Sequence, residues 1–433
     1  MVLSNSTIQR HSYVFYNDQG RAQQVHQSRL SQAARIDANQ DGILQRDELL
    51  EHLEHDHQGC HHHAQEKSDP QALVAELELH LQRKPNPSAK GYHSYEQVGQ
   101  DLDGLVAKYP TLCQKVSLGK SHEGREIWAL RISENIDSPE VAKRPGIVIT
   151  GCHHAREWMS VEIPLHVAHK LLDNYESDPD AKRRLQKAET WIVPLVNPDG
   201  YERSRTEDPW WRKNCRPVEH DALGNATSAV GVDLNRNYWD GNPDHLTLYR
   251  PEGDTPGSTD DDWGATSDDP DSDTYRGPAG GSEVEVTGLL QLEVGHPNVR
   301  AVIDHHAYGE MILYPWGYTE DPSPQKDLLV EIGQKLNESM GNRYNLQQSS
   351  GLYPSSGESD DMQSVNGLVS FTLEVGRSFQ PLPTTIPATC ELVGRANLTF
   401  IDEIVRRVED GSLPPRPETG PVQPPPHEGA PQP

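Results

Sequence analysis

Apolar and polar residues follow a different pattern on either side of residue 90. Before it the chain is mostly polar, whereas from Tyr92 onward apolar segments recur with recognisable periods. Strand-like runs occupy 126–133, 146–151, 190–196, 299–306 and 368–375. Helical spacing of apolar residues occurs in 95–110, 161–175, 282–294, 325–340 and 397–408. Strands that alternate with helices predict an α/β domain in which helices cover a sheet.

The same pattern divides the chain into four parts. They are an N-terminal region at 1–68, a proline-interrupted linker at 69–91, the α/β domain at 92–410 and a proline-rich tail at 411–433. The N-terminal region includes a tract with six histidines between His52 and His63. The tail should be extended and disordered because its composition cannot form a core.

Charge and cysteine content restrict the classes of function. The 433 residues contain 39 Lys and Arg against 66 Asp and Glu, a formal net charge of -27. This charge repels phosphate backbones and attracts cations and basic peptides, so nucleic-acid binding is excluded. Five cysteines without CxxC spacing suggest neither a disulfide framework nor a thiolate metal site. With no signal peptide or membrane span evident, we expect a cytoplasmic protein, with leaderless export as the alternative.

A calcium-binding loop is predicted in the N-terminal region. The segment DANQDGILQRDE matches the EF-hand pattern D-x-[DN]-x-[DN]-G-x5-E. The expected oxygen ligands are Asp37, Asn39, Asp41, the Ile43 carbonyl and Glu48. Helical patterns flank the loop and indicate a small helical EF-hand module that binds Ca²⁺. Its partner is open, because a single hand can pack on the α/β domain, pair in a dimer or anchor to another protein.

Metal ligands are predicted where two apolar strands end. After GIVITG, His154 and Glu157 are spaced i,i+3 and can reach one ion if a helical turn begins there. His305 and His306 end another apolar strand and offer a third ligand, and the spacing does not choose between them. Two histidines and one carboxylate suit a catalytic zinc with an open position. The alternative is a set of polar residues that cap a helix.

A strand-borne carboxylate is the candidate general base. Glu374 ends the run SFTLE among apolar neighbours, which suit a base whose pKa has to be raised. A plain strand-end carboxylate is the alternative.

The motifs together resemble a known family. CHHAREW, WRKN, GVDLNRN, HHAY with LYPWGY, LYPSSGESDD and SFTLEVG occur in the order typical of the M14 zinc carboxypeptidases, the carboxypeptidase A/B family. The resemblance implies an α/β domain with a mixed, mainly eight-stranded sheet flanked by helices. It also implies hydrolysis of the last peptide bond of a peptide. On these motifs His154, Glu157 and His306 fall on the zinc ligand positions, and Glu374 falls on the general base.

The resemblance also implies substrate-binding residues. Asn235 and Arg236 match the positions that bind the substrate's terminal carboxylate, Tyr353 matches a mobile tyrosine that closes over it, and Arg212 matches a subsite arginine. We expect the arginine that stabilises the oxyanion two residues after the lysine of WRK, where this chain has Cys215. Arg216, one residue later, is the hypothetical replacement.

The side-chain pocket is expected to favour basic residues. Asp360 matches the pocket floor, where aspartate implies preference for C-terminal Lys or Arg. The walls are expected to come from Leu313, Gly317, Ser355 and Thr372, and Glu358 either adds charge or is a solvated acid.

Three functions are compatible with these residues. The leading one is a zinc carboxypeptidase acting on peptide C-termini, with basic or dual specificity. The second is a calcium-regulated binding protein whose catalytic domain is impaired at Cys215, and Glu374 argues against it. The third is an amide hydrolase or deacylase of the same fold, which the carboxylate-binding residues leave open.

Overall fold

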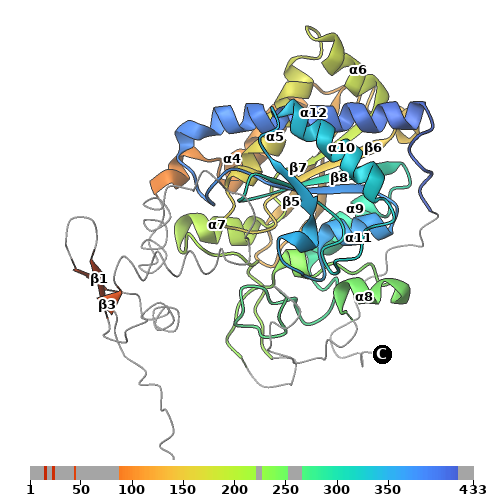
Figure 1. Ribbon diagram of the computed structural model, residues 1–433. Helices are drawn as coiled ribbons and strands as arrows, with labels where there is room; N and C mark the ends of the chain where they lie inside the picture. The colour runs from red at the N-terminus through yellow and green to blue at the C-terminus, as the bar shows by residue number, and fades with distance from the viewer. Residues whose placement is uncertain are drawn as a thin grey trace, which may run out of the picture. The chain divides into compact units, whose positions relative to one another are not determined.

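A computed structural model describes residues 14–16, 22–24, 43–44, 87–220, 227–251 and 266–417. Contacts divide the chain into two compact units. One consists of Met1–Pro87 with Arg203–Trp210, and the other of Ser88–Glu202 with Trp211–Pro433. The larger unit is built on an eight-stranded mixed sheet, which confirms the predicted fold class of the α/β domain (Figure 1).

The sheet has four parallel strands at its centre and an antiparallel pair at one edge. At the other edge a parallel pair joins the centre in antiparallel orientation. Its order is β10-β9-β11-β8-β6-β7-β5-β4. The strands are β4 Cys113–Lys120, β5 Glu126–Ile132, β6 Gly146–Gly151, β7 Glu189–Val193, β8 Val299–His306, β9 Met311–Tyr314, β10 Asn345–Gln348 and β11 Val369–Glu374. The apolar pattern predicted five of them. It missed β4, β9 and β10, because β4 is an edge strand with half-exposed polar residues and the other two have only four residues each.

Helices cover both faces of the sheet. The α-helices are α4 Tyr95–Lys108, α5 Met159–Asp173, α6 Pro179–Lys187, α7 Pro198–Thr206, α8 Leu246–Tyr249, α9 Val284–Glu293, α10 Lys326–Ser339, α11 Ser359–Val365 and α12 Ile386–Glu409. Short 3-10 helices occur at η3 Pro87–Gly91, η4 Pro139–Lys143, η5 Leu234–Arg236, η6 Pro243–His245, η7 Ser349–Gly351 and η8 Pro383–Thr385. In Figure 1, α5, α10 and α12 lie above the sheet, and α9 and α11 lie below it. None of the helices in the described ranges is long and apolar enough to cross a membrane.

Alternate side chains of the central strands enter two cores. In β6, Ile147 and Ile149 join the core under α5 and α12, whereas Val148 joins the core under α9. Phe371 of β11 packs edge-on against Phe400 of α12, with ring centroids 5.9 Å apart. Truncating a buried phenylalanine costs about 3–5 kcal/mol, so this packing fixes the strand ends firmly.

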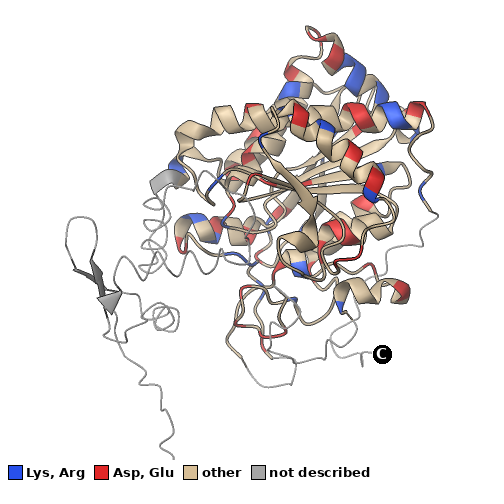
Figure 2. Cartoon of the chain, viewed as in Figure 1, with Lys and Arg blue, Asp and Glu red and all other residues tan. Residues whose placement is uncertain are grey.

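Charged residues lie on the outside of the helical layers. Figure 2 shows acidic residues on many elements and a group of basic residues on α6. Part of that basic charge is paired, since Arg184 of α6 lies 2.7 Å from Asp402 of α12.

In the smaller unit, the described residues before Pro87 form a three-stranded sheet that the sequence did not predict. It has the order β2-β1-β3, with β1 Val14–Tyr16, β2 Ala22–Gln24 and β3 Ile43–Leu44. Ile43 pairs with Val14 in the parallel β1-β3 ladder. The expected calcium ligands Asp37, Asn39, Asp41 and Glu48, and the helices expected to flank them, lie outside the described residues. The EF-hand therefore stays a prediction.

Packing of the larger unit extends beyond the boundary expected at residue 410. Leu413 is buried in the core under α12, and Arg416 Nη2 donates to the Val294 carbonyl at 2.7 Å. The extended tail was expected to begin at Gly411, and residues 411–417 contain neither helix nor strand. Arg300 Nη2 also donates to the Pro414 carbonyl, and Leu413 N–H donates to the Arg407 carbonyl at 2.9 Å, so several contacts hold this segment on the domain.

Candidate metal centre and substrate site

The ends of three parallel strands bring the predicted metal and base residues to one edge of the sheet. Gly151 of β6 is paired with His305 of β8, and His306 is paired with Glu374 of β11. Gly151 is required for this arrangement, because a Cβ at this position would lie 2.0 Å from the Ser160 carbonyl oxygen of α5. The strand end and the start of α5 can therefore approach closely only without a side chain there.

His154, Glu157 and His306 point at one another. His154 Nδ1 lies 2.8 Å from Glu157 Oε1, His306 Nδ1 lies 3.1 Å from Glu157 Oε2, and the two Nδ1 atoms are 3.0 Å apart. His154 and Glu157 precede α5 rather than lying in it. A turn with a hydrogen bond from Glu157 N–H to the His154 carbonyl, at 3.2 Å, brings their side chains to one side instead.

Each histidine ring is oriented by a carboxylate on its far side. His154 Nε2 lies 3.1 Å from Asp233 Oδ1, and His306 Nε2 lies 2.9 Å from Asp304 Oδ2. Such partners fix the ring and leave Nδ1 as the nitrogen that faces the shared position. The sequence analysis did not identify Asp233 and Asp304. Their positions in the DLNRN and IDHH motifs are the sequence signal that could have identified them.

The charge balance of this group favours a cation. Burial alone would lower the pKa of His306, but Asp304 and Glu157 raise it well above its ordinary value. Burial lowers the pKa of His154 and keeps that imidazole in the neutral form that binds metals. Two imidazoles and a carboxylate around one position are the donor set of a catalytic zinc site. The residues present therefore fit zinc.

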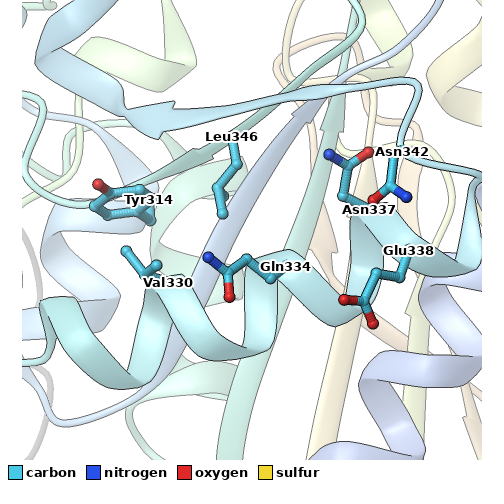
Figure 3. A pocket seen from close by; sticks show the side chains of 7 residues that line it. All are labelled: Tyr314, Val330, Gln334, Asn337, Glu338, Asn342 and Leu346. Carbon is cyan, nitrogen blue, oxygen red and sulfur yellow. The ribbon is translucent and has the colours of Figure 1, made fainter.

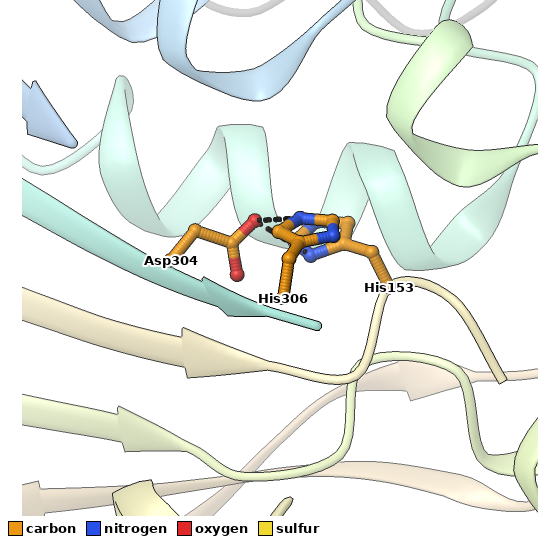
Figure 4. A group of neighbouring side chains, drawn as sticks. All are labelled: His153, Asp304 and His306. Atoms are coloured by element: carbon orange, nitrogen blue, oxygen red, sulfur yellow. Dashed lines mark hydrogen bonds and ion pairs between the residues drawn. The ribbon is translucent and has the colours of Figure 1, made fainter. Parts of the chain in front are cut away.

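The neighbouring histidines have structural roles. His153 lies 2.9 Å from Asp304 Oδ2, at an angle unfavourable for a hydrogen bond, and stacks on His306 with centroids 5.5 Å apart (Figure 4). Its Nε2 contacts the Tyr238 hydroxyl at 2.7 Å. His305 is held by the Thr150 carbonyl and by Asn397. Both nitrogens of each ring have neighbours, so His306 rather than His305 faces the metal position.

A pocket beside this centre collects most of the predicted substrate residues. It is lined by His154, Asn235, Arg236, His306, Leu313, Ser349, Leu352, Tyr353, Glu358, Asp360, Thr372 and Glu374. Of the expected wall residues, Leu313 and Thr372 line the pocket. Gly317 and Ser355 lie behind Glu358 instead, since a Cβ on Gly317 would meet Glu358 Oε2 and Ser355 Oγ donates to Glu358 Oε1 at 2.5 Å. Ser349 and Leu352 were not predicted.

Glu374 lies in this pocket beside the metal group. Burial raises its pKa to about 8, and the charge of Glu157 adds to the shift, while His306 and Arg212 oppose it. A carboxyl group in this environment accepts a proton readily, as a general base requires.

Asn235 and Arg236 form a rigid anchor on the opposite wall. They lie in η5, where the Asp233 side chain accepts from Asn235 N–H at 3.0 Å and so caps the turn. Arg236 is almost fully buried, with its Nη1 donating to the Asn235 carbonyl at 2.6 Å and to Glu358 Oε1 at 3.1 Å. The Tyr353 ring lies 5.9 Å from the Arg236 guanidinium. A buried guanidinium under an aromatic lid suits a carboxylate ligand.

Arg212 is the arginine that shares a carboxylate with the metal group. Arg212 Nε donates to Asp233 Oδ2 at 2.9 Å, the same carboxylate that holds His154. Arg216 instead pairs with Glu283, at 3.1 Å, and neither arginine is among the residues that line the pocket. The oxyanion role expected of Arg216 stays a prediction. Arg212, expected only as a subsite residue, is buried and is linked to His154 through their shared partner Asp233.

Three carboxyl groups gather at the pocket floor. Asp360 is buried and accepts from Ser349 Oγ at 2.7 Å, while Asp361 accepts from the backbone N–H groups of Gly317 and Tyr318. Burial and the charge of Glu358 raise the pKa of Asp360 to about 7. Burial and Asp360 raise the pKa of Asp361 well above its ordinary value. A cationic side chain would relieve this crowding of acids.

A second cavity of about 310 Å³ lies along α10 and shares none of these residues (Figure 3). It is lined by Tyr314, Val330, Gln334, Asn337, Glu338, Asn342 and Leu346. With a single carboxylate and no imidazole, this cavity does not assemble a catalytic group.

Comparisons with known proteins agree with this centre. The zinc carboxypeptidase family model (peptidase M14) matches residues 98–393. The chain is 30% identical over 325 residues to carboxypeptidase A1 of Mus musculus, covering 73% of this chain and 70% of that protein. It is 34% identical over 254 residues to carboxypeptidase A2 of Rattus norvegicus, and this match spans 59% of the chain and only 54% of that relative.

Solved structures show the same fold. Bovine thrombin-activatable fibrinolysis inhibitor, in complex with a tick carboxypeptidase inhibitor, superposes with a TM-score of 0.61 at 26% identity, covering 73% of this chain and 98% of that chain. Carboxypeptidase A from Helicoverpa armigera superposes with a TM-score of 0.63 at 23% identity, covering 90% and 84%. Family match, relatives and site geometry lead to one conclusion: the chain belongs to the zinc carboxypeptidase family, M14, and is a metallo-carboxypeptidase.

Proposed function

We propose that this chain removes single residues from the C-termini of peptides, with preference for Lys and Arg. The main observation in support of this reaction is that His154, Glu157 and His306 converge beside Glu374. The Asn235–Arg236 anchor lies in the same pocket. An anchor for a free carboxylate next to a hydrolytic centre selects the last peptide bond, because only a chain end carries that charge.

The residues divide the chemistry among them. A zinc ion held by His154, Glu157 and His306 would supply Lewis acidity toward water and the scissile carbonyl. Glu374 takes the proton of the attacking water and returns it to the leaving amine. Arg212 donates to the developing oxyanion.

The remaining contacts hold the substrate in register. Asn235 and Arg236 bind the terminal carboxylate by charge-assisted hydrogen bonds, and Tyr353 covers it and excludes water. Glu358 shares Arg236 with that carboxylate, so substrate binding has to compete with the Arg236–Glu358 pair. Asp360 faces the substrate's side chain from the pocket floor.

Basic specificity rests on the charges of the pocket. Glu358 and Asp360 line it, and Arg236 is the pocket's single arginine or lysine among the described lining residues. A lysine or arginine side chain would pair with Asp360 in a buried environment, where an ion pair is stronger than in water.

We also propose that the loop Asp37–Glu48 binds Ca²⁺, supported by its match to the EF-hand pattern. The change E48Q removes the bidentate ligand and should weaken Ca²⁺ binding at least ten-fold by calorimetry on the full chain. Equal affinity in wild type and E48Q would exclude the loop as a calcium site.

For the general base, E374Q should lower kcat/KM on a peptide by about 10²–10⁴ because the amide cannot accept a proton. Zinc content should stay equal to wild type, since Glu374 is not a ligand. The control E391Q changes an exposed glutamate of α12 and should leave kcat/KM within two-fold. An active E374Q enzyme would contradict the assigned role.

For the oxyanion, R212A should lower kcat by about 10²–10³ with a smaller change in KM. R212K should recover part of the loss, because it restores the charge without the planar donor. R216A should have an effect at least ten-fold smaller than R212A. Zinc content measured on each variant separates lost catalysis from a disturbed Asp233–His154 pair. A larger loss in R216A than in R212A would reverse the assignment.

For specificity, kcat/KM measured on peptides that differ only in C-terminal Arg or Phe should favour Arg at least ten-fold. D360N should lower that ratio at least ten-fold, because the buried positive charge loses its partner. The pKa of Asp360 is raised to about 7, so its charged form predominates above that pH. The Arg preference should therefore strengthen from pH 6 to pH 8 in wild type and stay flat in D360N. Similar release of Arg and Phe by wild type would refute basic specificity.

A further inference from the structure

A second group of potential metal ligands lies outside the catalytic pocket. His122 is in the turn between β4 and β5, and Glu283 and Glu285 flank the first residue of α9. One ligand atom from each residue lies within 4.8 Å of the other two. His122 Nε2 is 2.9 Å from Glu283 Oε2. None of the three residues lines the pocket beside Glu374.

Glu285 is the unusual member of this group. Its side chain is fully buried, and neither carboxylate oxygen has a hydrogen-bond partner. Its own backbone N–H approaches the carboxylate, but not in hydrogen-bonding geometry. Burial and the neighbouring charge of Glu283 raise its pKa to about 8. A buried carboxylate without partners is costly, so it requires a compensating proton or cation.

The positive groups nearby are engaged with other carboxylates. Arg216 Nη1 lies 3.1 Å from Glu283 Oε1, and Arg125 Nη1 lies 2.7 Å from Asp199 Oδ1. The negative charge of Asp199 raises the pKa of Glu285 further. The basic side chain of His122 lowers that pKa. Glu283 also accepts from Ser282 Oγ and Asn214 Nδ2. Glu283 is thus satisfied, whereas Glu285 is not.

We propose that His122, Glu283 and Glu285 hold a divalent transition-metal ion such as Zn²⁺ or Mn²⁺. One imidazole and two carboxylates form a donor set that these ions accept, whereas Ca²⁺ and Mg²⁺ prefer oxygen ligands alone. The two buried carboxylates supply the negative charge. The His122 side chain is 24% exposed, so an ion can enter from solvent on that side.

The site would have a structural consequence for the catalytic centre. Asn214, which donates to Glu283 Oε2 at 2.7 Å, lies two residues after Arg212 and accepts from Val232 N–H at 2.8 Å. An ion here would tie together the β4–β5 turn, the start of α9 and the segment that carries Arg212. It would act by holding these segments, not by contact with substrate.

The test compares metal content of the full chain in four forms. Wild type, E285Q, H122A and E293Q are equilibrated with Zn²⁺ or Mn²⁺, and bound metal per chain is measured after removal of excess. Glu293 is a matched control because it lies on the same helix, is equally buried and also has a pKa raised to about 8. We expect E285Q and H122A to bind one equivalent less than wild type, and E293Q to equal it. Other sites on the chain contribute equally to all four forms.

Anomalous diffraction from wild-type crystals grown with the same metal provides a second measurement. A peak between His122, Glu283 and Glu285 is expected at the metal's absorption edge. H122A changes a partly exposed side chain, so it remains informative if E285Q does not fold. Unchanged metal content in H122A, or no peak at this position, would overturn the proposal and leave Glu285 as a carboxyl group neutralised by a proton.

Discussion

Parallel pairing of β6, β8 and β11 is the constraint on which the rest of the site depends. The register places Gly151 beside His305 and His306 beside Glu374, so the strand ends deliver ligand and base to one edge of the sheet. The apolar residues of these strands are buried in two cores that helices close on both faces. A shift of one residue would turn every side chain to the opposite face, so the packing and the site fix the same register.

Buried carboxylates organise what the strands assemble. Asp233 contacts both His154 and Arg212, and so couples the ring that faces the metal position to a buried arginine. Asp304 plays the corresponding part for His306. Interactions of this kind are strong because the surroundings are poorly polarisable, and for the same reason an unpaired partner is costly. The acidic excess of the chain is thus partly structural and partly a feature of the pocket.

Sequence patterns and structure agree where a segment's environment is encoded locally. The five apolar strands and the long amphipathic helices were predicted because burial on both faces leaves a continuous apolar run, and burial on one face leaves a helical period. β4, β9 and β10 escaped because edge strands and four-residue strands do not have to be apolar throughout. The packing of 411–417 was not predicted, because a proline-rich composition does not show which residues contact the domain.

The sequence by itself determined the class of fold, the candidate ligands His154 and Glu157, and the motifs that identify the family. It determined them because strand ends and short spacings are local properties. Spacing left His305 and His306 open until the family motifs favoured His306, and tertiary structure shows the partners of each ring, with His306 against Glu157 and His305 against Thr150. It also placed Arg212 on Asp233 and Arg216 on Glu283. Tertiary structure also brought His122 close to Glu283 and Glu285, although Glu283, the nearer of the two in sequence, is 161 residues away along the chain. Adjacent residues offer the same chemistry, and only the surrounding partners fix which of them turns inward.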